Sequence, residues 1–171
     1  MERNFLVSIA FSLAVAGLIL NACSIAPKPK PTVQMSTPFN EADFAPYAKK
    51  GTGVISGQVF SKTVGGDVKY GAGSTVYLYP KTPYIVEYFA QATSGKNVEN
   101  IDPRAGKSGK TTTCDGQGNY EFKELPPGDY ILISSVFWGV PTRYGISNTG
   151  GEIRKDVTVR DGEYLKVMLT P

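Results

Sequence analysis

The sequence of 171 residues contains no histidine, only two cysteines and a single tryptophan. Without histidine, a Ser-His-Asp triad, a Cys-His pair and a zinc site with imidazole ligands are all excluded. The formal net charge is only +3, and the cations are scattered along the chain. The sequence therefore has no basic stripe of the kind that nucleic-acid binding requires.

Glycine, proline and aromatic residues are plentiful instead, with 19 Gly, 12 Pro, 10 Tyr and 8 Phe. This composition favours short strands joined by turns over helices. The length predicts one domain with appended segments, and a body of about 120 residues is large enough to bury a hydrophobic core.

The first 22 residues have the pattern of a targeting segment. Residues 5–20 are uncharged and largely apolar, which fits a signal peptide better than a membrane span. The following Leu20-Asn21-Ala22-Cys23 resembles a bacterial lipobox, which implies that Cys23 carries acyl chains in the mature protein. Buried acyl CH₂ groups contribute ~0.8 kcal/mol each, so several chains would hold the protein on a membrane. The alternative is a signal peptide with an incidental cysteine at this position.

Ser24 follows Cys23, which in Gram-negative lipoproteins suggests sorting to the outer membrane. We therefore expect a lipid-anchored protein of the cell envelope, in the outer membrane if the host is Gram-negative. Residues 23–52 would be a lipidated tether, because Pro27-Lys28-Pro29-Lys30-Pro31 favours an extended polyproline conformation. Phe39, Phe44 and Tyr47 could dock part of this tether on the body, or the tether could be a mobile linker; the sequence leaves both open.

Residues 53–171 have the pattern of a folded β domain. Glycine turns at 115–118 and 126–129 flank a segment in which Tyr120 and Phe122 alternate with polar residues, as in a half-buried strand. Tyr130 to Val136 is a longer apolar run, apolar on both parities near Ile131–Ile133, as in a central strand. Strands are expected at 53–60, 74–79, 111–114, 119–123, 129–137, 153–159 and 163–169. Asp161-Gly162 indicates a hairpin between the last two.

Two longer segments interrupt these strands. In residues 81–110, Thr82 can cap a helix, Pro83 suits its first position and Gly95 would end it, whereas residues 97–110 are expected to form a mobile loop. Residues 137–151 are also expected to be a loop. Loops on a rigid scaffold commonly bind ligands, so these two segments are predicted to form the working surface together.

The central pattern also resembles the carboxypeptidase regulatory-like domain, a transthyretin-like (prealbumin-like) sandwich. The matching positions are Asp115, Gly118, Tyr120, Phe122, Leu125, Pro126, Gly128, Tyr130 and Leu132. The resemblance implies an all-β fold, a seven-stranded transthyretin-like β-sandwich with one short helix in the long excursion. It also implies a non-catalytic module, and the missing histidine excludes the zinc-dependent carboxypeptidase domain itself.

The remaining polar candidates have ordinary structural explanations. Cys114 has no intramolecular partner if Cys23 is acylated, so it is a buried strand residue, a reactive thiol or half of an intermolecular disulfide; burial is the favoured interpretation. Asp115, Glu121, Glu124 and Asp129 are interpreted as turn caps and solvated strand residues. We therefore predict no catalytic, metal-binding or cofactor-binding residues, and no enzyme.

Aromatic residues remain as candidates for partner contact. Tyr84, Tyr88 and Trp138 are the candidate partner-binding residues, with Trp138 the best single anchor, because aromatic rings stack on sugars and on proteins alike. The resulting hypothesis is a membrane-anchored envelope lipoprotein that presents a non-catalytic β-sandwich for structural or protein-binding roles, with an envelope protein as partner. The alternative is a carbohydrate- or peptidoglycan-binding module.

Overall fold

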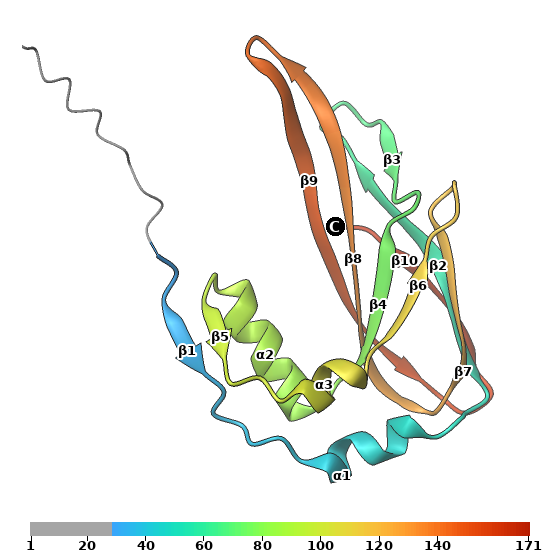
Figure 1. The fold of residues 1–171 in the computed structure, drawn as a ribbon. Coiled ribbons are helices and arrows are strands. Elements are labelled where there is room, and N and C mark those ends of the chain that lie inside the picture. Colours follow the sequence, from blue (N-terminus) through green and yellow to red (C-terminus); the bar gives the residue numbers. More distant parts are fainter. Residues whose placement is uncertain (1–28) are drawn as a thin grey trace, which may run out of the picture.

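The computed structural model describes residues 29–171, which form an all-β sandwich of two sheets with a short helix packed on one side (Figure 1). Sheet I consists of β2 (Gly53–Lys62), β3 (Val68–Tyr70), β7 (Asn119–Leu125) and β10 (Tyr164–Leu169). Sheet II has the order β6 (Lys110–Thr113), β4 (Thr75–Pro80), β8 (Gly128–Thr142) and β9 (Gly145–Val159). All seven strands expected from the sequence are present, and β3 adds an eighth to the sandwich.

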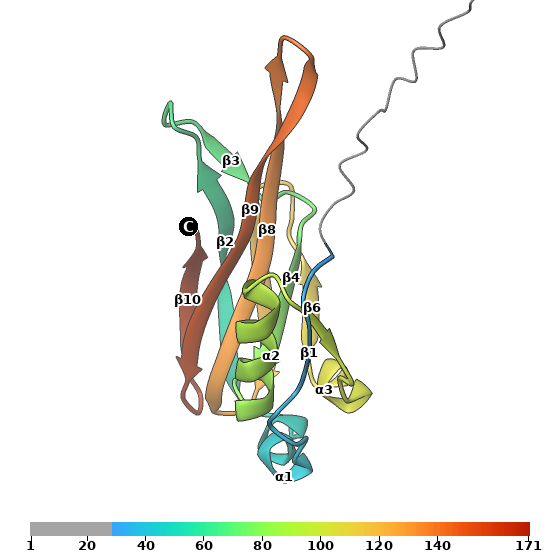
Figure 2. The same ribbon diagram turned by 90° about the vertical axis from the view of Figure 1, so that its left-hand side faces the viewer.

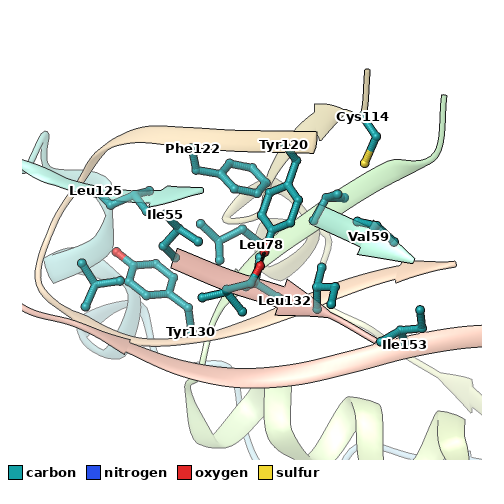
Figure 3. Packing of buried hydrophobic residues seen from close by; sticks show 14 of the residues in the cluster. Ile55, Val59, Leu78, Cys114, Tyr120, Phe122, Leu125, Tyr130, Leu132 and Ile153 are labelled. Carbon is teal, nitrogen blue, oxygen red and sulfur yellow. Dashed lines mark hydrogen bonds between the residues drawn. The ribbon is translucent and has the colours of Figure 1, made fainter. Parts of the chain in front are cut away.

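The core between the two sheets comes from the alternating positions of these strands (Figure 3). Tyr120 and Phe122 of β7 and Tyr130 and Leu132 of β8 are each at most 5% exposed, which confirms the predicted alternation of β7. The Tyr120 hydroxyl donates to the Val167 carbonyl at 3.0 Å, so its polar atom is satisfied inside the core.

Sheet II is apolar on its second face as well, because helices cover that face. Ile131 and Ile133 of β8 point away from the sandwich core and pack in a second cluster. Its other buried members are Phe44, Tyr84, Ile85 and Ala105. They lie in or beside α1 (Glu41–Phe44), α2 (Pro83–Thr93) and α3 (Pro103–Lys107). The apolar run on both parities of β8 thus reflects its central place between two cores.

Residues 32–48 pack against the body. Of the two alternatives for this segment, a docked arm or a mobile linker, the structure shows the docked arm. Strand β1 (Thr32–Gln34) pairs in parallel with β5 (Asn97–Glu99), and η1 (Ala45–Ala48) follows α1. Phe39 stacks on Phe44 with ring centroids 4.8 Å apart, and Tyr47 meets Tyr130 edge to face at 5.2 Å. Figure 2 shows this arm running along the α2 side of the molecule. The boundaries at residues 22 and 52 stay predictions.

Glu87 of α2 fastens this arm through three hydrogen bonds. Its Oε1 accepts from the Ser36 backbone N–H at 2.7 Å and from the Ser36 hydroxyl at 2.6 Å, and its Oε2 accepts from the Thr37 N–H at 2.6 Å. These bonds, with the one from the Ser36 side chain foremost, lower the pKa of Glu87 from 4.5 to about 2.

The prediction of a mobile loop over residues 97–110 is wrong. This segment holds β5, then α3, then the first residue of β6. Asp102 caps α3 by accepting from the Arg104 N–H at 2.9 Å, and Pro103 occupies the first helical turn. The Tyr84 hydroxyl accepts from the Asp102 N–H at 2.7 Å, which ties the segment to α2. A capped single turn has too little periodicity to stand out from polar loop sequence.

The predicted hairpin at Asp161-Gly162 is also wrong. The turn is present, with Gly162 at φ 69°, but β10 pairs in parallel with β2 of sheet I while β9 belongs to sheet II. Turn residues permit a reversal of the chain whether the next strand stays in the same sheet or crosses to the other. The local sequence therefore predicted the turn but not the strand with which β10 pairs.

Candidate ligand-binding groove

Strands β8 and β9 form a long hairpin that projects beyond the helices, at the end of the molecule opposite α1 (Figures 1 and 2). Their ladder is unbroken from Gly128↔Val159 to Thr142↔Gly145. At the tip, the Thr142 hydroxyl donates to the Gly145 carbonyl at 2.8 Å, and Gly145 has φ 128°. The prediction of a loop over residues 137–151 is therefore wrong, because these residues continue the two strands.

Trp138 stands on the inner face of this hairpin. It has the same parity as Leu132 and Val136, and its half-buried ring packs against the edge of the sandwich core. Gly150 of β9 makes room for the ring: a Cβ there would lie 3.0 Å from Trp138 Cζ3 and only 2.0 Å from the Val136 carbonyl oxygen. Its φ of +112° is also a conformation that favours glycine.

The hairpin between β2 and β3 provides the opposite wall. Asp67 and Thr63 close this turn, since the Thr63 N–H donates to the Asp67 carbonyl and the Asp67 N–H donates to the Thr63 hydroxyl. Lys69 lies opposite Ser61 in the β2–β3 ladder. Ser61 is buried on the inner face of β2, so Lys69 also points inward and is half-buried.

Together the two hairpins enclose an open groove of about 610 Å³ at the end of the sandwich. We call it the Trp138 groove. It is lined by Lys62, Thr63, Val64, Gly65, Asp67, Lys69, Trp138, Gly139, Val140, Pro141 and Thr149. The groove combines one aromatic ring with hydroxyl, ammonium and carboxylate groups. Such a site suits a ligand that has both apolar faces and many polar groups.

Tyr84 and Tyr88 lie elsewhere, on the outer face of sheet II. Tyr84 is 3% exposed and belongs to the packing under α2, so its ring is not available for the partner contact expected of it. Tyr88 is half-buried and meets Phe89 edge to face at 5.2 Å. Both tyrosines line a small pocket of about 120 Å³. Because Trp138 faces the opposite side of sheet II, the predicted joint surface of residues 81–110 and 137–151 does not form.

A second open groove, of about 580 Å³, lies on the outer face of sheet I. Its lining includes Gln58, Asn119, Glu121, Tyr164 and Lys166. Tyr164 is 66% exposed. The composition of the sequence gave no indication of this groove, because it depends on the parallel pairing of β10 with β2.

Asp115 and Cys114 occupy structural positions. Asp115 Oδ1 accepts from the Gln117 and Asn119 N–H groups at 2.8 Å, which holds the turn before β7. Cys114 is 4% exposed, and burial, followed by the charge of Asp115, raises the pKa of its thiol to about 11. Within residues 29–171 there is no cluster of three or more potential metal-ligating side chains.

The targeting segment and Cys23 lie outside the described residues. Over the part of the chain that the structure describes, no helix is long and apolar enough to cross a membrane.

No protein-family model matches this chain. Colossin-A of Dictyostelium discoideum is 31% identical over 83 residues, which is 48% of this chain but 1% of that protein. The chain thus matches only a very small part of this curated relative.

Among solved structures, a candidate carbohydrate-binding protein from Pseudomonas aeruginosa superposes with a TM-score of 0.67 and 28% identity. The match covers 79% of this chain and 99% of that one. A minor pilin of Streptococcus agalactiae gives a TM-score of 0.38 at 18% identity over 71% of this chain and 44% of that one, a likeness that supports no conclusion about function. This chain therefore shares its sandwich architecture with the Pseudomonas protein over nearly all of that protein's length.

Proposed function

We propose that this protein is a non-catalytic β-sandwich module that binds carbohydrate in the Trp138 groove. The observation that carries the proposal is the half-buried indole of Trp138 between two hairpins with polar side chains. The likeness to the candidate carbohydrate-binding protein from Pseudomonas aeruginosa supports it, because that match extends over 79% of this chain.

The chemistry of the groove suits a sugar ring. One face of a pyranose is made largely of C–H groups and packs on an aromatic ring, while its hydroxyls need hydrogen-bond partners. Thr149, Thr63 and Asp67 supply such partners beside Trp138. Because Trp138 is only half-buried, part of the indole remains available to a ligand.

Retention on immobilised glycans tests the proposal. The wild-type chain should be retained by at least one glycan column, and Trp138→Leu should lose this retention while circular dichroism still reports a folded β protein. Tyr164→Leu is the matched control, since it removes an exposed ring from the groove on sheet I. Loss of retention in the control alone would place the site on sheet I and contradict the proposal.

Protein binding is a second candidate function, favoured by the exposed apolar residues at the hairpin tip. Phe137 is 63% exposed, Ile146 78% and Tyr144 92%. Phe137 and Ile146 have the parity opposite to Trp138 and so lie on the other face of the hairpin. A double Phe137→Ser, Ile146→Ser variant separates the two functions: loss of an envelope protein partner with glycan retention unchanged would support protein binding there.

We further propose that the protein is a lipoprotein, anchored by acyl chains on Cys23 and located in the outer membrane if the host is Gram-negative. The lipobox-like residues 20–23 support this. If the arm stays docked from Thr32, only nine residues, Cys23 to Pro31, separate anchor from body, a reach of at most about 30 Å. Cys23→Ser should release the protein from the membrane fraction; unchanged retention would contradict the anchor.

Membership of the carboxypeptidase regulatory-like family belongs to the same proposal. The motif residues of that resemblance occupy the places which such a sandwich needs: Tyr120 and Tyr130 lie in the core and Gly118 lies in a turn with φ 80°. These domains are non-catalytic, which agrees with a role in binding.

A further inference from the structure

The walls of the Trp138 groove are mainly cationic. Residues 61–70 and 136–151, which form the two hairpins around it, contain the cations Lys62, Lys69 and Arg143 and a single acid, Asp67. Lys62 and Lys69 both line the groove, whereas Arg143 lies at the hairpin tip. A ligand in the groove therefore meets a positive local field.

The two groove lysines, unlike some lysines of the body, have no acidic partner in the part of the chain that the structure describes. Lys50, Lys81 and Lys123 each form an ion pair, with Glu124, Asp156 and Glu121 respectively. Within residues 29–171, neither Lys62 nor Lys69 forms one. Their charge is thus not neutralised by a contact within this part of the chain.

Lys69 is the better placed of the two lysines. It is half-buried on the inner face of β3, the face that turns toward Trp138 across the sandwich. Asp67 is exposed at the turn, where its backbone bonds to Thr63. Of the two charged residues, Lys69 is therefore the more buried. An interaction with Lys69 is less screened by solvent than one between fully exposed side chains.

We propose that the groove selects sugars that carry an anionic substituent, a carboxylate or a sulfate, with Trp138 on the sugar ring and Lys69 and Lys62 paired with the anion. This inference rests on the proposed carbohydrate binding and names the ligand class of that same site. The aromatic ring supplies contact with any sugar of suitable shape, and the lysines discriminate between a charged and a neutral one.

Matched polysaccharides test the inference. Dextran sulfate is compared with dextran, and oligogalacturonate with its methyl ester, so that each pair differs mainly in charge. Trp138 is the only tryptophan of the chain, so its fluorescence reports on the groove during titration. We expect at least one anionic member to bind about tenfold or more tightly than its neutral counterpart. That preference should shrink as salt rises from about 50 mM to about 500 mM.

Charge-removing variants test whether Lys69 causes the preference for the anionic ligand. Lys69→Gln should weaken binding of the anionic ligand about tenfold, and so reduce the preference over its neutral counterpart, whereas Lys123→Gln on the outer face of sheet I should not change that preference. An equal loss with Lys123→Gln would mean a non-specific charge effect and would overturn the inference. Which of the two anionic ligands binds distinguishes carboxylate from sulfate recognition.

The remaining outcomes separate the inference from the proposed function. Equal affinity for charged and neutral sugars would overturn the anionic preference and leave carbohydrate binding intact. Inorganic sulfate that binds as tightly as dextran sulfate would mean that the sugar contributes nothing. If none of the four polysaccharides perturbs Trp138, and the immobilised glycans retain nothing, both the inference and the proposed function are wrong.

Discussion

At the scale of single residues, alternation along the strands places side chains reliably, because a half-buried strand has a period of two. Phe122 is 5% exposed in β7, and its neighbour Lys123 is exposed, with its ammonium group paired with Glu121. Phe122→Ala should therefore cost ~3–5 kcal/mol of unfolding free energy, whereas Lys123→Ala should change it by less than ~0.5 kcal/mol. Urea denaturation of the two variants measures this difference. Similar losses in both would mean that the parity of β7 is wrong.

Cys114 gives a second prediction at this scale. Since burial raises its pKa to about 11, little thiolate is present near neutral pH. The surrounding core side chains also hinder access of a reagent to the sulfur atom. Maleimide should modify Cys114 slowly in the native full-length chain and rapidly after denaturation, measured by mass spectrometry of the peptide that contains it. Rapid native labelling, or a disulfide-linked dimer, would instead support the reactive-thiol alternative.

At the scale of elements, the docked arm depends on Glu87. Its folded-state pKa of about 2 is below the ordinary value of 4.5, so its contribution to docking is complete above about pH 4.5 and is lost as the pH falls toward 2. Hydrogen exchange of the Ser36 and Thr37 amides should accelerate over that window, after correction for the intrinsic rate. Glu87→Gln should accelerate the same amides at neutral pH.

Glu99→Gln is the matched control for the arm. Glu99 lies in β5 beside the arm, but no side-chain hydrogen bond joins it to residues 32–48. The control should leave exchange at Ser36 and Thr37 unchanged. Slow exchange in Glu87→Gln would show that the apolar contacts of Phe39 and Phe44 hold the arm without the carboxylate.

The projecting hairpin gives the second prediction for an element. Gly150→Ala would place a Cβ 2.0 Å from the Val136 carbonyl oxygen in a backbone conformation that L residues rarely adopt. This variant should disrupt the ladder near Trp138, shift its fluorescence and weaken glycan retention. Gly151→Ala, where a Cβ would meet nothing within 4 Å, should cause none of these three changes. If both variants behave like the wild type, the close packing around Trp138 is not needed.

The sequence indicated the positions of seven of the eight sandwich strands, but not β3, the extent of the hairpin or the pairing of the last strand. Gly139, Asn148, Gly150 and Gly151 have low strand propensity, so residues 137–151 resembled a loop, yet the ladder between β8 and β9 overrides that preference. Trp138 was identified as a candidate because a large aromatic side chain in a segment flanked by glycine and proline offers an apolar ring and one hydrogen-bond donor to a partner. Lys62 and Lys69 were not, because their approach to Trp138 depends on contact between segments far apart in the chain.

At the scale of the whole molecule, the two faces of sheet II serve different purposes. The outer face is covered by the helices and the arm, and the inner face forms the sandwich core and, at its open end, the Trp138 groove. Figure 1 shows the groove-forming hairpins, β2–β3 and β8–β9, at the end opposite α1. If Cys23 is anchored, the short reach from Thr32 would keep the body close to the membrane surface.

The most direct test of carbohydrate binding is to locate a bound glycan on the molecule. Backbone amide chemical shifts of the isotopically labelled protein, recorded by NMR during titration with a glycan that the columns retain, report each groove separately. We expect the largest changes on residues 62–69 and 138–149, with the Trp138 indole N–H among them. Changes centred on Gln58, Asn119 and Tyr164, or on α2, would contradict the assignment of the site to the Trp138 groove.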